Sequence, residues 1–155
     1  MSSTFRPTLF YRDPLAALSW LEEAFGFETT LLVTDSEGRA SHVEMRFGDG
    51  VLSLGAELES RAFLGSAVMK SPASLKGQGT QFVRVSLDGG IDEHCRRAET
   101  AGAQIVQRPE NQFYGARVYR ALDPEGHVWA FEQEMSEVSI PEMERASGLK
   151  IQASL

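Results

Sequence analysis

The chain repeats one order of helix and turn signals, and this repeat limits the folds that it can adopt. In the first half, a helix start is followed by a helix stop 13 residues later and by a hairpin turn a further 24 residues on. In the second half, the same signals are separated by 14 and 24 residues. The signals are Asp13, Gly26 and Gly50 in the first half and Asp88, Gly102 and Gly126 in the second. Agreement at all three positions predicts two copies of one structural unit.

Each unit is expected to run as a strand, a helix and three further strands. Asp13 is a favourable N-cap, Pro14 suits the first helical position and Gly26 suits the C-terminal cap. The strands are predicted from β-branched and aromatic residues and from alternating polarity. In the first half they are expected at 7–11, 28–34, 41–47 and 51–55. In the second half they are expected at 80–87, 103–107, 116–122 and 127–133, with a helix at 91–101.

The length of 155 residues suits one domain with a substantial core. We expect that domain at 1–133, with modules at 5–56 and 80–133 and a connector at 57–79. A connector of this length is often functional or mobile. The C-terminal tail at 134–155 is expected either to dock as a short helix or to fray.

Charge and cysteine content exclude several classes of partner. The net charge of −7 disfavours nucleic acid, which needs a basic face, and an anionic membrane surface. The first residues show no signal peptide, and no apolar stretch is long enough to span a bilayer. The single cysteine, Cys95, excludes an internal disulfide and a cysteine-rich metal site. We therefore expect a cytoplasmic protein.

Three segments carry a resemblance to a known family: TLFYRDPLAALSWLEEAFGFE, ASHVEMRFGDGVLSLG and YGARVYRALDPEGHVWAFE. Together they resemble the vicinal-oxygen-chelate (glyoxalase/bleomycin-resistance/dioxygenase) superfamily, in its glyoxalase-like branch near the bleomycin-resistance and phosphonate-operon B-type proteins. The resemblance implies an α+β fold, with two βαβββ modules that form a curved, cup-shaped mixed sheet. It also implies a homodimer that holds a ligand or a metal on the concave side.

The metal ligands of that superfamily are missing at the matching positions. Its metal-dependent members use His, Gln or Glu from four strands, which suits an open octahedral site. The matching positions here offer Arg6 or Thr8, Ser53 or Leu54, Thr80 or Gln81, and Ala130 with Glu132 two residues further on. Arginine has no lone pair to give, and only the displaced glutamate is a plausible ligand. We therefore expect no metal and no cofactor.

His42 and Glu44 are the weak candidates for catalysis. They share one strand face with Arg46, opposite Val43 and Met45. A neutral imidazole beside a carboxylate can act as a base near pH 7. The alternative is an outward polar stripe on a half-solvated sheet.

The candidate ligand-binding residues are expected to line the cup. Arg84 should point inward with Phe82, because Val83 and Val85 need burial, and His42 and Glu44 should lie on the adjacent strand. Arginine among aromatic rings can bind a carboxylate or a flat ring, although an ion pair with Glu44 or Glu132 is the alternative. The predicted set is Thr8, Phe10, His42, Glu44, Phe82, Arg84, Tyr114, Arg117 and Glu132. For strand 116–122 the alternative is a core Tyr119 and an Arg117 that pairs with an acid, and the 57–79 connector is expected near the mouth.

The other histidines and the tryptophans are expected to be structural. His94 is predicted to be a solvated residue on the second helix, and His127 to bond the backbone of the adjacent turn. Trp20 and Trp129 are predicted to be buried.

Two functions remain open at this point. The first is a metal-free binding protein that holds a small organic molecule in the cup of a homodimer. The second is a glyoxalase-like lyase, isomerase or dioxygenase, which uses either His42 and Glu44 or a metal site at other residues.

Overall fold

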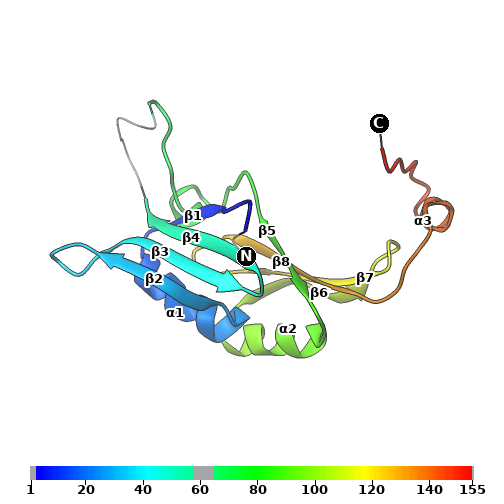
Figure 1. The fold of residues 1–155 in the computed structure, drawn as a ribbon, viewed down its shortest axis with the longest axis horizontal. Coiled ribbons are helices and arrows are strands. Elements are labelled where there is room, and N and C mark those ends of the chain that lie inside the picture. Colours follow the sequence, from blue (N-terminus) through cyan, green and yellow to red (C-terminus); the bar gives the residue numbers. More distant parts are fainter. Residues whose placement is uncertain (1–2, 58–64, 155) are drawn as a thin grey trace.

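The protein is an α+β structure with two separate four-stranded sheets, shown as a computed structural model in Figure 1. The structure describes residues 3–57 and 65–154, so part of the predicted connector, 58–64, lies outside the described residues. The first module contains β1 (Thr8–Tyr11), α1 (Pro14–Phe25), β2 (Glu28–Thr34), β3 (Ala40–Phe47) and β4 (Gly50–Ala56). The second contains β5 (Val83–Leu87), α2 (Ile91–Thr100), β6 (Gln104–Asn111), β7 (Ala116–Leu122) and β8 (Val128–Glu134). The predicted repeat of βαβββ modules is therefore confirmed.

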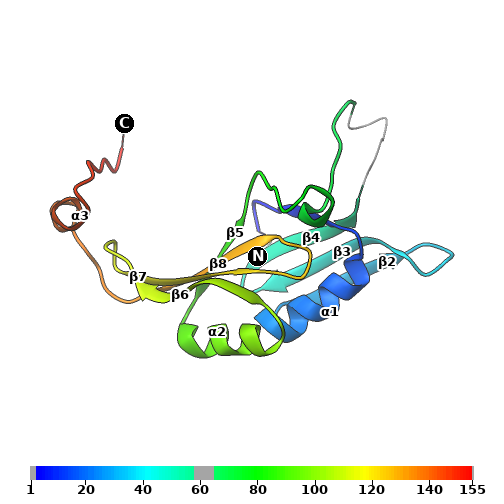
Figure 2. The same cartoon turned by 180° about the vertical axis from the view of Figure 1, so that it is seen from behind.

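The two sheets have the same topology. The first has the strand order β1-β4-β3-β2 and the second the order β5-β8-β7-β6. In each sheet the first strand of the module runs parallel to the last strand, and the remaining pairs are antiparallel. Helices α1 and α2 lie side by side on one side of the sheets, which leaves the opposite faces of both sheets open (Figures 1 and 2).

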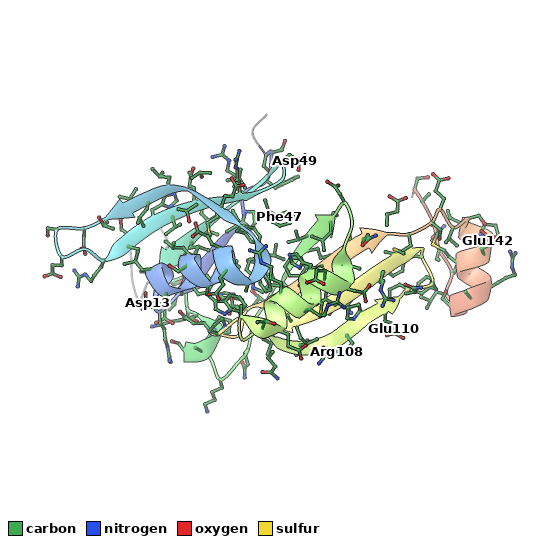
Figure 3. The ribbon with its side chains drawn as sticks, turned by 90° about the horizontal axis from the view of Figure 1, so that it is seen from below. Asp13, Phe47, Asp49, Arg108, Glu110 and Glu142 are labelled. Carbon is green, nitrogen blue, oxygen red and sulfur yellow. The ribbon has the colours of Figure 1, made fainter. Side chains whose placement is uncertain are left out.

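Helix α1 begins and ends where its sequence predicts. The Asp13 side chain accepts a hydrogen bond from the backbone N–H of Ala16, and Pro14 occupies the first turn. Gly26 ends the helix with φ 80°, a left-handed conformation that favours glycine. Leu21 and Phe25 on this helix are fully buried, so α1 contributes its apolar face to the core. Figure 3 shows Asp13 at the end of α1 that lies away from α2.

The second module differs from the prediction at the start of its first strand. Strand β5 begins at Val83 and not at Thr80, because its partner β8 begins at Val128 and the register pairs Val83 with Trp129. In this register Thr80 and Gln81 lie beyond the start of β8. The third element, β6, runs to Asn111, beyond the predicted end at Gln107, with two register shifts along its pairing with β7.

The two modules share one aromatic core. The ring of Phe25 from the first module packs against Trp129 and Phe131 from the second, at centroid distances of 5.3 and 4.7 Å. His94 on α2 lies in this seam, where one ring nitrogen is 2.7 Å from the Tyr119 hydroxyl and the other is 2.9 Å from the Phe25 carbonyl oxygen. The prediction of a solvated His94 is therefore wrong, because α2 turns this side chain toward α1.

Two further contacts join the helices across the seam. Trp20 is half-buried, and its indole N–H donates to the carbonyl of Ala101 at 2.7 Å. Arg97 donates to the carbonyls of Glu22 and Glu23 at 2.8 and 2.7 Å. These carbonyls are at the C-terminal end of α1, where a helix favours positive charge.

A buried aspartate in the second module holds the first module in place. Asp123 accepts hydrogen bonds from the Tyr11 hydroxyl at 2.7 Å and from the Trp129 indole at 3.1 Å. Its other oxygen accepts from the backbone N–H groups of Glu125 and His127 at 3.0 Å. The His127 ring lies 2.8 Å from the carbonyl oxygen of Phe10, so it bonds the backbone of β1 and not of its own turn.

The C-terminal tail contains a helix that stands apart from the body. Helix α3 (Ile140–Ser147) has no buried residue, and it lies beyond the ends of β7 and β8 in Figures 1 and 2. The tail therefore forms the expected helix, but the helix buries no residue against the described part of its own chain. Within the described residues, no helix has both the length and the apolar character that crossing a membrane requires.

Candidate functional site

The open face of the second sheet contains a hollow lined by aromatic and charged side chains. Its volume is about 350 Å³. The lining residues are Phe82, Arg84, Tyr114, Val118, Arg120, Ala130 and Glu132. Phe82 and Tyr114 are 50% and 36% exposed, which is high for aromatic rings, so both present their surface to the hollow.

Strand alternation places these side chains together. Trp129, Phe131 and Tyr119 are fully buried on the helix side of β7 and β8. Their neighbours along each strand must therefore point to the open face. The register then brings Ala130 between Arg84 on β5 and Arg120 on β7, because it is paired with both.

The charges of the hollow are partly paired within it. Arg84 donates to Glu132 at 2.5 Å, which is the ion pair predicted as one alternative. This hydrogen bond, with the negative charge of Glu132, raises the pKa of the Arg84 guanidinium above its usual value. The Arg84 side chain is still 59% exposed, so much of the guanidinium remains accessible to a ligand. Arg120 donates to the neutral Gln107, which leaves the hollow with one more positive than negative side chain.

Arg120 and not Arg117 is the arginine of β7 that lines the hollow. Arg117 lies on the helix side, where its guanidinium donates to both carboxylate oxygens of Asp92 at 2.8 and 3.0 Å. Arg117 therefore does not line this hollow with the other predicted residues, and the alternative of a core Tyr119 with a paired Arg117 is confirmed. A buried Tyr119 predicts that Arg120 lies on the open face, because residues 118 and 120 must point to the opposite side of the strand.

The first-sheet candidates form a separate group. The His42 imidazole lies 3.5 Å from the Glu44 carboxylate on the open face of β3, and Arg6 lies 4.0 Å from the same carboxylate. Strand β3 is in the first sheet and β5 is in the second, so the prediction that His42 and Glu44 lie on the strand next to Arg84 is wrong.

Thr8 and Phe10 line another hollow, beneath the connector. It has a volume of about 170 Å³, and connector residues such as Val68 and Leu75 form one of its walls. The connector is held there because Arg12 donates to Ser74 at 2.7 Å and to the Ala73 carbonyl at 2.9 Å. The described part of the connector thus covers β1 and is absent from the lining of the Arg84 hollow.

The side chains at the family's metal positions do not form a suitable ligand set. Thr8 is paired with Ser53 in the register of the first sheet, and both offer only a hydroxyl. In the second sheet the carboxylate of Glu132 is bonded to Arg84. Among residues 3–57 and 65–154, no three His, Cys, Asp or Glu side chains lie close enough to hold an ion. The donors present here do not fit a divalent metal, and we derive no step through one.

A family model matches most of the chain. The glyoxalase/bleomycin resistance protein/dioxygenase superfamily model covers residues 5–131. The chain belongs to this superfamily. The match includes both modules, and it ends before α3.

Similar proteins come from actinobacteria and other bacteria. An uncharacterized protein of Mycobacterium tuberculosis H37Rv is 28% identical over 140 residues, which cover 90% of this chain and 79% of the relative. The crystal structure of TioX from Micromonospora sp. ML1 is 28% identical, with a TM-score of 0.65 over 88% of this chain and 100% of TioX. A glyoxalase-related enzyme from Fulvimarina pelagi has the same TM-score at 17% identity, over 86% of this chain and 89% of that protein, which shows the fold alone.

Proposed function

We propose that this protein binds a small, flat organic anion on the open face of the second sheet. The observation that carries the proposal is the gathering of Phe82, Tyr114, Arg84 and Arg120 around one hollow of about 350 Å³. Pockets for small molecules typically combine apolar rings with a few directed polar groups, at volumes of about 300–1,000 Å³. Aromatic rings bind a flat ligand, and arginine binds a carboxylate through two parallel hydrogen bonds.

The hollow is open, and we propose that a second copy of the chain completes it. Both sheets leave one face uncovered in a single chain (Figure 1), and a homodimer would pair these faces. The same proposal places the protein in the cytoplasm, where its single cysteine, the buried Cys95, needs no disulfide partner.

The binding proposal is tested by calorimetric titration with 2-naphthoate and with its uncharged amide. The carboxylate should bind more tightly than the amide because only the carboxylate pairs with an arginine. Arg84→Ala should weaken 2-naphthoate by roughly 1–3 kcal/mol, which is about five- to 150-fold in affinity. Arg96→Ala is the matched control, because Arg96 is also exposed and paired with a glutamate, Glu93, but lies on helix α2, away from both open faces.

The titration has two outcomes that contradict the proposal. One is equal affinity for the acid and the amide, which would show that no arginine pairs with the carboxylate. The other is an equal loss of affinity in Arg84→Ala and Arg96→Ala, which would reflect only the overall charge of the protein.

A second candidate function is favoured by the 3.5 Å contact between His42 and Glu44. A carboxylate can orient an imidazole for proton transfer, which is the step that a glyoxalase-like lyase or isomerase needs. The assay is isomerisation of the hemithioacetal of methylglyoxal and glutathione, with and without added nickel or zinc. Activity that is lost in His42→Gln would support this function, and absence of activity under all conditions would reject it.

A further inference from the structure

Helix α3 is well specified by its sequence, although the described part of the chain buries none of its residues fully. Ser139 and Glu142 form a reciprocal capping box, in which each side chain bonds the backbone of the other. Pro141 lies in the first turn, and Gly148 ends the helix with φ 72°. Such complete start and stop signals favour a defined helix and not a fraying tail.

An isolated helix of this length is not stable in water. Helix α3 has eight residues, whereas isolated helices shorter than about 12–15 residues are marginal. Its apolar side chains Ile140 and Met143 lie one turn apart on the same face and are not fully buried, and Leu149 beyond it is 59% exposed. The described residues of its own chain therefore cover this face only in part.

A complementary surface exists on the edge strand of the first sheet. Among residues 3–57 and 65–154, strand β2 pairs only with β3, and it exposes three consecutive aliphatic residues. Leu31, Leu32 and Val33 are 43%, 43% and 42% exposed, so side chains on both faces of this strand lack cover. An uncovered apolar edge strand invites pairing with another chain, and natural proteins usually protect it.

The two surfaces lie too far apart to meet within one chain. They occupy opposite ends of the long axis, with the β2–β3 hairpin at one end and α3, marked by Glu142, at the other (Figures 1 and 3). To reach β2, the tail would have to pass back along β8 and then across the four strands of the first sheet. That path is roughly 17 Å plus roughly 14 Å at ordinary strand spacings. The five-residue link between β8 and α3 spans at most roughly 18 Å when fully extended.

The start of the tail is also fixed in direction. The backbone N–H groups of Met135 and Ser136 donate to the Gly115 carbonyl at 2.8 and 3.1 Å, which holds the tail against the β6–β7 hairpin. A side chain at position 115 would collide with the Ser136 carbonyl oxygen. Glycine at this position therefore permits the close approach that directs the tail away from its own sheets.

We propose that α3 of one chain docks on β2 of a second copy, and that the second copy returns the same contact. A two-fold axis brings opposite ends of two identical molecules together, so each tail meets the partner's edge strand and the arrangement closes. In a two-fold dimer the contact between α3 and β2 forms twice, so the total buried area is doubled. This doubling brings two small contacts closer to the roughly 1,200 Å² that specific interfaces bury. The proposal extends the homodimer proposed above by naming the segment that holds it, and it does not depend on the ligand.

Cross-linking between two different single-cysteine additions tests the docking directly. Met143→Cys and Leu32→Cys chains, one carrying a mass tag, are mixed and treated with a short bismaleimide; Cys95 is 2% exposed and does not compete. A cross-linked product that contains both chains is expected. Asp49→Cys replaces Leu32→Cys as the control, because Asp49 is exposed at the β3–β4 turn of the same module (Figure 3), and it should react at least tenfold more slowly.

Sedimentation of the full chain supplies the second measurement. The protein should be a dimer, and Met143→Asp and Leu32→Asp should each raise its dissociation constant at least tenfold while the circular dichroism of the body is retained. Arg145→Ala is the matched control, because it changes the net charge by the same amount on the exposed side of α3.

Three results would overturn the docking. They are a monomeric full chain, a dimer that tolerates both aspartate substitutions, and a Met143→Cys/Leu32→Cys double variant that cross-links only within one chain. A dimer that tolerates both substitutions would leave the proposed ligand site and the pairing of open faces intact.

Discussion

Replacement of Asp123 by alanine tests whether this aspartate holds the two modules together. Asp123 is 6% exposed, and the groups that donate to its side chain come from both modules. The Tyr11 hydroxyl and the Trp129 indole are almost wholly buried, at 1% and 0% exposure. Burial and the nearby Asp123 charge raise the pKa of the Tyr11 hydroxyl well above its usual value, so tyrosine stays a donor.

The expected loss follows from the groups that the substitution leaves without a partner. Each buried donor left unsatisfied costs about 1–3 kcal/mol, and Asp123→Ala orphans two side-chain donors. We therefore expect the free energy of unfolding to fall by about 4 kcal/mol, a large part of the 5–15 kcal/mol typical of a domain. Tyr11→Phe removes one donor together with its hydrogen bond, so it leaves no donor unsatisfied. It should lower the free energy of unfolding by only about 1 kcal/mol.

Urea unfolding followed by circular dichroism measures both variants. Asp35→Ala is the control, because Asp35 also accepts hydrogen bonds from the backbone of its own turn, but at an exposed site. Its unfolding midpoint should barely move. The reasoning is refuted if Asp123→Ala lowers the free energy of unfolding by less than about 1 kcal/mol, or if it matches Asp35→Ala.

Two further predictions concern protons and metal. Burial lowers the pKa of His94 below its usual value, so the unfolded chain binds this proton more readily. Stability should therefore fall as the pH drops through about 6.5 toward the lower pKa of the folded state. Thermal melts across that pH range should show that the melting temperature falls less in His94→Gln than in the unmodified protein. An equal fall in both proteins would contradict the role given to His94. Chelation with EDTA should leave the melting temperature unaltered, whereas a large drop together with stoichiometric metal by elemental analysis would refute metal independence.

The elements that the sequence predicted well are those with local physical causes. The cap at Asp13 and the stop at Gly26 depend on neighbouring backbone groups, so the residues alone define α1. The alternation in β3 depends only on which residues need burial, and Val43 and Met45 are indeed fully buried. The same reasoning placed Arg84 on the open face, where it bonds Glu132, one of the two acids named for the alternative ion pair.

The errors arose where the outcome depends on distant parts of the chain. Thr80 has good β-forming character, but its strand starts later because β8 offers no partner there. His94 lies on a helix rich in charged residues, and only the packing of α2 on α1 buries it. His42 and Arg84 are separated because their strands belong to two different sheets. The local sequence around either residue does not indicate which strands share a sheet.

The shared aromatic core has a consequence for the order of folding during synthesis. Phe25 is made early, but Trp129 and Phe131, which cover it, belong to the last strand of the body. A nascent chain that has emerged only as far as residue 57, at the start of the connector, thus exposes the apolar end of α1, and the ribosome must complete about 75 more residues before this end is covered. At about 5–20 residues per second, that interval lasts roughly 4–15 seconds, during which the first half depends on chaperones or on its own solubility.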